Sequence, residues 1–256
     1  MSANTLGLAR HFGDPAVYEA EFDRPSFSGE RRYYLICCAP RVGSWLLCDL
    51  LESSGVMGVP AEYFNTHSGF HRMTERFGLI GDGKVNLNAY IQALKESRTG
   101  ANGVLGIKIQ YWMMPPLFRA KVISRHFPGI RFIYLDRYDL INQGVSYEIA
   151  RRTEQWTELS SERALDFDST KVEQAIQFIL RERSSWHHFF ALNQIKPLRL
   201  NYEDLIDDTD STCNSICAHV GIETDWAFSL QKARIRKQDI PEKEEWVRRL
   251  REKGGY

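Results

Sequence analysis

Four short apolar runs recur along the chain, and longer amphipathic segments separate them. The runs cover residues 33–38, 103–109, 130–135 and 196–200, and each has the length of a buried strand. The intervening segments place apolar side chains at helical spacing and predict helices over residues 87–98, 115–126, 139–152, 171–193 and 202–220. Because strands alternate with helices, the pattern favours an α/β fold with a mostly parallel sheet covered on both faces.

The first apolar run is followed by the features of an anion site. A turn at residues 40–44 leads into a helix whose one face carries four leucines between residues 46 and 51. Unpaired amides and the helix dipole favour an anion at such a helix start. Gly43 allows close approach of the backbone, Arg41 adds a cation and Ser44 adds a hydroxyl donor. The segment predicts a phosphate or sulfate site, with an ordinary strand-to-helix connection as the alternative.

The same loop differs from the phosphate loop of nucleotide triphosphatases. It lacks the Gly-x-x-x-x-Gly-Lys-Ser/Thr pattern and carries Arg41 where those proteins carry lysine. A nucleotide kinase is therefore disfavoured. Ligands of parallel sheets bind beyond the carboxyl ends of the strands, which is the edge where this loop is expected.

Composition bounds the organisation and the partners. With 256 residues, 43% of them hydrophobic, we expect one α/β domain over residues 32–256 and an N-terminal extension, residues 1–31, packed on it. Lys plus Arg and Asp plus Glu both number 33, so net charge gives no indication of a nucleic-acid partner. No apolar segment is long enough for a transmembrane helix, and residues 1–31 lack a signal-peptide core.

The cysteines indicate a reducing compartment. Their odd number argues against a disulfide framework, and a metal site at Cys213 and Cys217 would need more ligands than the nearby His219. We expect five free, buried thiols and a cytoplasmic protein, with the cysteines at positions 37, 38, 48, 213 and 217.

The tail predicts a charged helix over residues 241–253. Trp246 and Leu250 mark its apolar face, which we expect to dock on the core. A lid over the ligand or a contact between subunits is the alternative.

Beyond these patterns, eight short motifs follow one another along the chain. They are Pro-Arg-x-Gly-Ser at 40–44, Gly-Val-x-Gly-x-Pro-x-Glu-Tyr-Phe at 55–64, Leu-Gly-Ile-Lys at 105–108, Phe-Ile-Tyr-Leu-x-Arg at 132–137, Gln-x-Val-Ser at 143–146, Trp-x-x-Phe-Phe at 186–190, Pro-Leu-x-Leu-x-Tyr-Glu-Asp-Leu at 197–205 and Lys-Gln-Asp at 237–239. In this ordered set, from about residue 33 to 251, the chain resembles the trehalose 2-sulfotransferase-like enzymes, which include relatives that sulfate lipopolysaccharide.

The resemblance implies a P-loop-like three-layer fold with a mostly parallel central sheet flanked by helices. It also implies transfer of a sulfuryl group from 3′-phosphoadenosine-5′-phosphosulfate (PAPS) to a hydroxyl, usually on a sugar, without a metal. A small hydroxyl acceptor is the expected partner, and a homodimer is suggested by analogy.

The resemblance also assigns roles to residues. Glu62 matches the position of the catalytic base, and Arg41 would stabilise charge on the leaving group, as in phosphoryl transfer. We expect Glu62 to be partly desolvated with a raised pKa. The 3′-phosphate would bind Arg137 and Ser146. The 5′-phosphosulfate would lie on the turn and the first helical residues, namely Pro40, Arg41, Val42, Gly43, Ser44 and Trp45.

The acceptor side is assigned more loosely. Lys108 ends a strand at the same edge and could contact the sulfate or the acceptor. His67 and His71 are competing bases that we expect to line the acceptor region. Aromatic side chains could stack on a sugar face or belong to the core, namely Tyr63, Phe64, Tyr111, Trp112 and Trp156.

Three positions depart from the family pattern. Val42 and Trp45 replace hydroxyl residues that could have bonded the donor phosphate, and Asp136 stands where relatives often carry an extra arginine. These changes keep open a non-catalytic scaffold that binds adenosine 3′,5′-bisphosphate, or a sulfotransferase that acts on a secondary metabolite.

Overall fold

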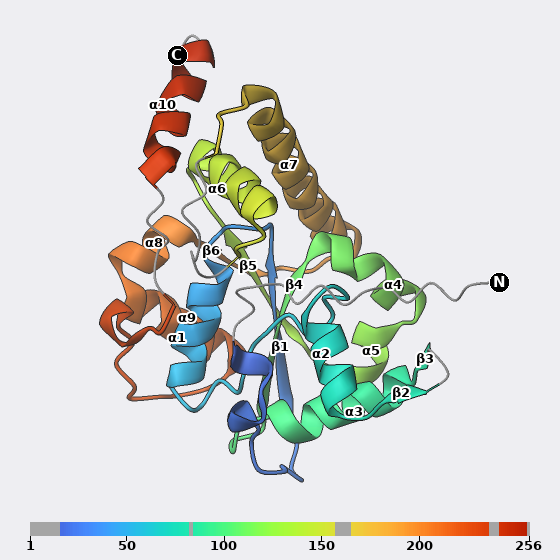
Figure 1. Cartoon of the computed structure of the whole chain (residues 1–256). Helices are drawn as coiled ribbons and strands as arrows, with labels where there is room; N and C mark the ends of the chain where they lie inside the picture. Colours follow the sequence, from blue (N-terminus) through green and yellow to red (C-terminus); the bar gives the residue numbers. More distant parts are fainter. Residues whose placement is uncertain (1–15, 82–83, 157–164, 236–240, 255–256) are drawn as a thin grey trace, which may run out of the picture.

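The fold is built on a parallel sheet. The structure is a computed structural model that describes residues 16–81, 84–156, 165–235 and 241–254. In the described part of the chain the main sheet has the order β4-β1-β5-β6, with every neighbouring pair parallel (Figure 1). This confirms the predicted parallel sheet, whose strands are β1 (Arg32–Cys38), β4 (Val104–Gln110), β5 (Arg131–Asp136) and β6 (Leu198–Asn201).

The side chains of strand β1 are buried on both faces of the sheet. Successive side chains of a strand point to opposite faces, and every residue of β1 after Arg32 is buried. Tyr33 and Leu35 belong to one apolar core, whereas Tyr34 and Ile36 belong to another. The run of apolar residues without polar alternation therefore forms the centre of a three-layer fold.

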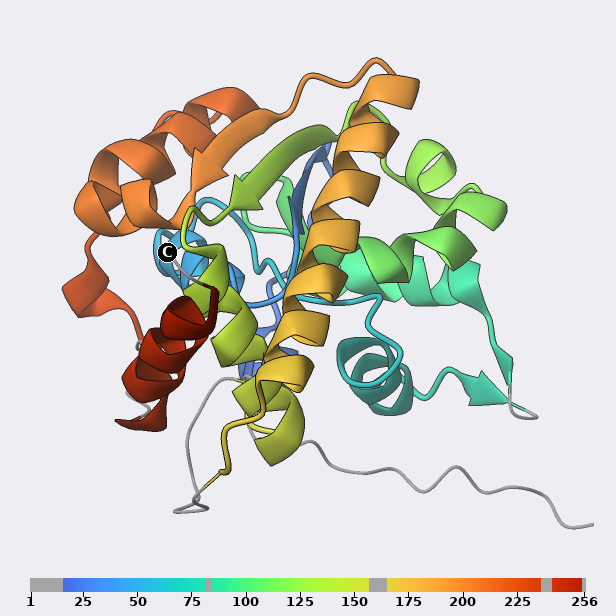
Figure 2. The same ribbon diagram turned by 90° about the horizontal axis from the view of Figure 1, so that it is seen from above.

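Helices occupy both layers. On one side lie α1 (Ser44–Ser53), α8 (Tyr202–Asp207) and α9 (Thr209–Val220) (Figure 1). On the other lie α3 (Leu87–Arg98), α4 (Met114–Arg119) and α5 (Val122–His126). The long helix α7 (Ser169–Leu192) runs past the sheet (Figure 2). Its Trp186 is fully buried.

A third, smaller core joins α6 (Leu140–Thr153), α7 and α10 (Pro241–Gly254). Trp246 and Leu250 of α10 are buried there with Val145 and Ile149 of α6. The predicted docking of the terminal helix is confirmed, and it brings Lys243 to the cavity described below.

The predicted helix over 115–126 is wrong in one respect. It is divided into α4 and α5, because Lys121 takes a left-handed conformation (φ 52°) that ends the first helix. The remaining short elements are η1 (Ala16–Tyr18), η2 (Ala20–Phe22), α2 (Gly69–Arg76), β2 (Ile80–Gly81), β3 (Lys84–Val85), η3 (Tyr111–Met113) and η4 (Leu230–Lys232).

The described part of the N-terminal extension contacts the domain. Tyr18 is buried, and its ring meets those of Trp45 and Tyr63 edge-on at 6.3 Å. The buried Arg98 donates to the carbonyl oxygens of Tyr18 and Glu19, at 3.1 and 3.2 Å. Residues 1–15 lie outside the described residues. Within the described ranges no helix is both long and apolar enough to cross a membrane.

Candidate active site

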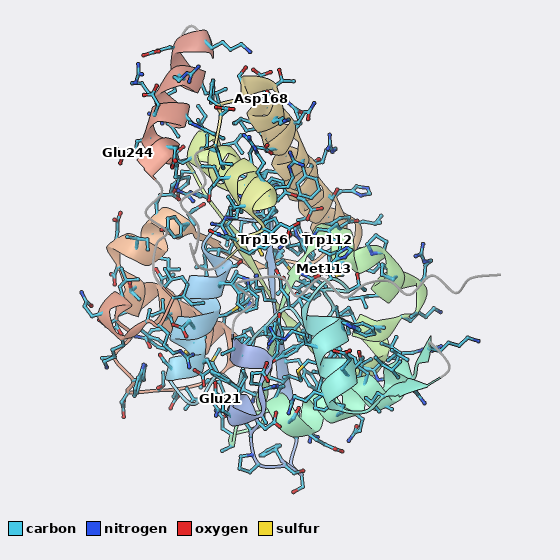
Figure 3. The ribbon with its side chains drawn as sticks, viewed as in Figure 1. Glu21, Trp112, Met113, Trp156, Asp168 and Glu244 are labelled. Atoms are coloured by element: carbon cyan, nitrogen blue, oxygen red, sulfur yellow. The ribbon has the colours of Figure 1, made fainter. Side chains whose placement is uncertain are left out.

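A cavity of about 600 Å³ opens beyond the carboxyl ends of β1, β4 and β5. Trp112 and Trp156, both labelled in Figure 3, belong to its lining. The structure brings together twelve of the residues selected from the sequence, namely Pro40, Arg41, Gly43, Ser44, Trp45, Glu62, His67, Lys108, Trp112, Arg137, Ser146 and Trp156.

Five of the selected residues do not line this cavity, namely Val42, Tyr63, Phe64, His71 and Tyr111. The Tyr63 side chain is fully buried in the core, and its hydroxyl donates to the carbonyl oxygen of Val59. The prediction that Tyr63 stacks on a sugar is therefore wrong. The Val42 side chain is also fully buried, between β1 and α1. Val42 as a whole residue is 0% exposed and does not line the cavity.

The backbone of the turn after β1 adopts an unusual conformation. Arg41 (φ 64°) and Gly43 (φ 77°) are both in the left-handed region, and α1 begins at Ser44. A Cβ atom on Gly43 would lie 2.3 Å from the ring of Tyr202. Glycine is therefore required here both by conformation and by the close approach of α8. The left-handed Arg41 is the kind of outlier that clusters at functional sites.

We call the wall formed by Arg41, Arg137 and Ser146 the arginine wall. The Arg41 Nε donates to Ser146 Oγ at 3.0 Å, and its Nη1 donates to the carbonyl oxygen of Trp156. Burial and the neighbouring charge of Arg137 lower the pKa of Arg41 to about 10. Arg41 therefore stays charged at neutral pH. The charges of Arg41 and Arg137 repel each other, so an anion bound between them would be stabilised.

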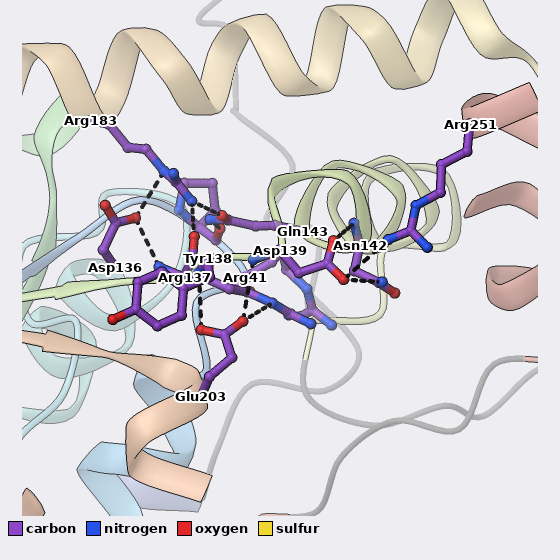
Figure 4. A network of polar contacts seen from close by, with 11 residues as sticks. Arg41, Asp136, Arg137, Tyr138, Asp139, Asn142, Gln143, Arg183, Glu203 and Arg251 are labelled. Carbon is purple, nitrogen blue, oxygen red and sulfur yellow. Dashed lines mark hydrogen bonds and ion pairs between the residues drawn. The ribbon is translucent and has the colours of Figure 1, made fainter. Parts of the chain in front are cut away.

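Arg137 is held from three sides. Its Nη1 donates to the carbonyl oxygen of Arg41 (3.2 Å), and its guanidinium lies 4.7 Å from the ring centre of Tyr202. The Nε atom lies 3.8 Å from Oε1 of Glu203 (Figure 4). The same oxygen accepts from the Asp139 amide, and Oε2 accepts from the Tyr138 amide. The loop after β5 is thus fixed to the loop after β1.

We call the opposite wall, formed by Glu62, Asn65, Lys108 and Gln110, the carboxylate wall. Ala61 forms an isolated parallel bridge with Ile107, and its carbonyl oxygen accepts from the Lys108 amide at 2.9 Å. This pairing aligns residue 62 with the end of β4. It places the Glu62 carboxylate 2.6 Å from the Lys108 Nζ, although 46 residues separate them in the sequence.

The Glu62 carboxylate is buried, with 4% of the residue exposed. One oxygen accepts from Lys108 (2.6 Å) and Gln110 (2.9 Å), and the other accepts from Asn65 (2.9 Å). Burial raises the pKa of Glu62, but the Lys108 charge and these hydrogen bonds outweigh it and hold the pKa below its ordinary value. The prediction of a raised pKa is therefore wrong.

Aromatic rings lie beside the carboxylate wall. The Lys108 ammonium lies 3.9 Å from the ring centre of Trp45, a cation–π contact. Trp45 thus lies between Lys108 and the buried Tyr18 instead of filling the cavity. The ring centres of Trp112 and His67 are 5.7 Å apart at the cavity lining. His71 does not line this cavity and pairs with Glu75 on α2 at 3.5 Å.

Trp112 is fixed at two points. Its indole Nε1 donates to Gln110 (2.9 Å), and its backbone amide donates to Glu182 of α7 (3.3 Å). Burial raises the pKa of Glu182 to about 7, although the amides of Trp112 and Tyr111 partly oppose this. Since the indole N–H is already engaged, Trp112 offers the cavity its apolar ring.

Several cavity residues were missed in the sequence. Gln110 had a signal, because it follows Lys108 by two positions in a strand and so lies on the same face. The others come from segments with no motif of their own. They include Asn65, Ser68, Tyr147, Phe178, Ile235 and Lys243.

Similarity to known proteins identifies the family of this chain. The sequence profile of the Stf0 sulphotransferase family matches residues 33–253. The chain belongs to the Stf0 sulphotransferase family. It is 26% identical over 258 residues to a trehalose 2-sulfotransferase of Mycolicibacterium smegmatis, covering 85% of this chain and 94% of the relative. A trehalose 2-sulfotransferase of Mycobacterium tuberculosis is 24% identical over 257 residues, covering 86% and 94%.

A solved structure supports the fold. The sulfotransferase domain of the Synechococcus PCC 7002 olefin synthase superposes with a TM-score of 0.50 at 17% identity, covering 91% of this chain and 98% of that domain. The chain is thus a sulfotransferase with the family's α/β fold. The Lys-Gln-Asp motif at 237–239 lies outside the described residues. Among those described, no three His, Cys, Asp or Glu side chains gather as a metal site.

Proposed function

We propose that this sulfotransferase moves a sulfuryl group from PAPS to a hydroxyl of a carbohydrate. The observation that carries the proposal is the cavity with its two opposed walls. One wall presents two arginines and a helix start, and the other presents a buried carboxylate. A donor with two anionic ends and an acceptor with a hydroxyl need such a pair of walls.

The arginine wall suits the donor. The turn at residues 40–44 would take the 5′-phosphosulfate, on the amides at the start of α1 and on Arg41. Arg137 and Ser146 would take the 3′-phosphate. Neither loss of a hydroxyl removes this framework, because Val42 is turned into the core and Trp45 contacts Lys108.

The carboxylate wall suits proton removal. The acceptor oxygen attacks sulfur, and an O–S bond forms while the bond from sulfur to the 5′-phosphate oxygen breaks. The electron pair of that bond stays on the phosphate oxygen, beside Arg41, and the acceptor proton passes to Glu62. The Glu62 oxygen that accepts from Asn65 is not the one paired with Lys108. It is the oxygen we assign to the acceptor hydroxyl.

Lys108 couples the two walls. It neutralises Glu62 and also contacts Trp45 in the first turn of α1. A bound donor sulfate competes with Glu62 for the Lys108 charge. Any share of that charge taken by the sulfate raises the pKa of Glu62 and makes it a better base. The base is thus strengthened when the donor is in place.

The acceptor assignment rests on the relatives and on the aromatic lining. Both relatives are named for trehalose, and the rings of Trp112 and His67 could stack on a sugar face. Trehalose is therefore the first acceptor to test, followed by other disaccharides and glycolipids.

The decisive experiment is an assay of the purified protein with PAPS and these acceptors, read by mass spectrometry for an added sulfate. We expect sulfated product with at least one sugar and none without donor. Binding of adenosine 3′,5′-bisphosphate without turnover on any acceptor would favour the scaffold. No binding of that nucleotide would contradict the donor assignment.

A cytoplasmic location and a homodimer stay predictions. The five cysteines are free and buried, which fits a reducing compartment. Size-exclusion chromatography with light scattering tests the dimer.

A further inference from the structure

Arg183 lies on α7, outside the residues that line the cavity, yet its side chain reaches the loop after β5 (Figure 4). Its Nε lies 2.9 Å from a carboxylate oxygen of Asp136. Its Nη2 donates to the carbonyl oxygen of Arg137 at 2.6 Å and to Oε1 of Gln143 at 2.5 Å. One guanidinium thus holds three groups that are 40 to 47 residues away in the sequence.

These contacts continue to the loop after β1. The Gln143 Nε2 donates to the carbonyl oxygen of Pro40 at 2.6 Å, and Arg137 donates to the carbonyl oxygen of Arg41 at 3.2 Å. Arg183 is therefore connected to this loop by two routes, one through Gln143 and one through Arg137. Together the contacts form a closed ring of hydrogen bonds behind the arginine wall.

The ring addresses two costs of this wall. Arg41 is held in a left-handed conformation, which persists only where the surroundings impose it. Asp136 directly precedes Arg137, and its unpaired charge would weaken the attraction of the wall for anions. Arg183 supplies the compensating cation, so the position that departs from the family pattern is neutralised from behind.

We propose that Arg183 is a positioning residue that sets the spacing of the two donor loops. It fixes the loop after β5 directly and the loop after β1 through Gln143, and it cancels the charge of Asp136. The proposal rests on the proposed function, because the spacing matters only if one ligand with two anionic groups spans both loops. Arg183 itself does not touch that ligand.

The test measures binding of adenosine 3′,5′-bisphosphate by calorimetry, together with kcat and the KM for PAPS. Arg183→Met is expected to weaken nucleotide binding by about tenfold to a hundredfold, as for other residues that orient a ligand-binding group. We expect the KM for PAPS to rise more than kcat falls. Arg183→Lys, a point charge without the planar fork, should show a smaller loss. Arg181→Met, on the exposed side of the same helix, is the matched control and should bind as the wild type does.

A double-variant cycle separates positioning from general stability. If Arg183 acts through the loop that carries Arg137, its substitution should have a much smaller effect when Arg137 is already methionine. Equal losses in both backgrounds would overturn the proposal, as would wild-type affinity in Arg183→Met. If Arg183→Met does not fold, Arg183→Lys carries the test, and wild-type affinity in that variant overturns it. Wild-type protein that binds no nucleotide overturns the proposed function and this inference together.

Discussion

The two walls of the cavity handle charge in opposite ways. On the arginine wall, burial, together with the neighbouring charge of Arg137, lowers the pKa of Arg41 to about 10. On the carboxylate wall, Glu62 and Lys108 form a buried ion pair whose charges cancel. The arginine wall has two like charges that a bound anion would neutralise, whereas the charges of the carboxylate wall already neutralise each other.

The difference shows that the arrangement of each wall depends on different interactions. The arginine wall depends on backbone geometry and on supports behind it, because like charges would otherwise move apart. In the proposed mechanism, the carboxylate wall depends on a pairing that the substrate disturbs before proton transfer. The proposal therefore assigns preorganisation to the first wall and a substrate-induced change in charge pairing to the second.

The sharpest way to break this comparison is Glu62→Gln. We expect kcat to fall by about 10²- to 10⁴-fold, because a general base is lost, while nucleotide binding on the opposite wall stays near wild type. Rates from a sulfate-transfer assay and calorimetry measure the two effects. Glu75→Gln, on the nearby helix α2, is the matched control. A fully active Glu62→Gln would assign the proton to another group.

The arginine wall is tested by Arg41→Met. We expect kcat to fall by about 10²- to 10³-fold, since the cation at the leaving oxygen is removed, and nucleotide affinity to fall with it. Arg41→Lys should lie between this variant and the wild type, because lysine keeps the charge and loses the fork. Normal nucleotide affinity in Arg41→Met would place the donor elsewhere.

Backbone geometry of the same wall is tested by Gly43→Ala. The left-handed conformation costs about 1–2 kcal/mol with a Cβ atom, and here the Cβ also meets Tyr202 at 2.3 Å. We expect a lower melting temperature and about tenfold weaker nucleotide binding. Gly55→Ala is the control, because Gly55 has a similar φ (71°) and no atom within 4 Å of its Cβ position. Equal losses in both variants would show that the Tyr202 contact is unimportant.

The smallest effect on turnover is expected from Glu182→Gln, behind the carboxylate wall. Burial raises the pKa of Glu182 to about 7 in the folded protein, whereas the unfolded chain has an ordinary value near 4.5. The unfolded state therefore releases this proton first, so wild-type stability falls as pH rises between about 4.5 and 7. The glutamine variant should lack this part of the fall.

Thermal unfolding of both proteins at pH 5 and pH 8 measures that difference. We expect turnover to change by less than about threefold, the effect of one neutral hydrogen bond. The variant should gain stability relative to the wild type as pH rises. An identical pH dependence in the two proteins would contradict the raised pKa.

The sequence was sufficient for the scaffold and for one wall. The strand, turn and helix around Arg41 and Ser44 follow local rules, so their place at the sheet edge could be predicted. Tyr63 was misassigned because it directly follows Glu62 in the sequence. In the structure it lies in a turn that is closed by a hydrogen bond from the Asn65 amide to the Glu62 carbonyl oxygen (3.1 Å), and its side chain is buried in the core.

Residues that act across long sequence separations could not be predicted. Arg183 is one charged residue in a 24-residue helix, and its partners lie on β5 and α6. The lowered pKa of Glu62 likewise depends on Lys108, which a separate strand brings close. Motifs identify groups of the right chemistry, but their charge state depends on neighbours that only the fold supplies.

The N-terminal helix η1 also supports a residue of the cavity lining. The ring of Tyr18 packs edge-on against Trp45, and Arg98 of α3 donates hydrogen bonds to the backbone of Tyr18 and Glu19. The Trp45 indole, which contacts Lys108, therefore packs against a segment that precedes every strand of the domain. A chain shortened to begin at Asp23 would keep all the motifs but lose the Tyr18 ring that packs against this indole.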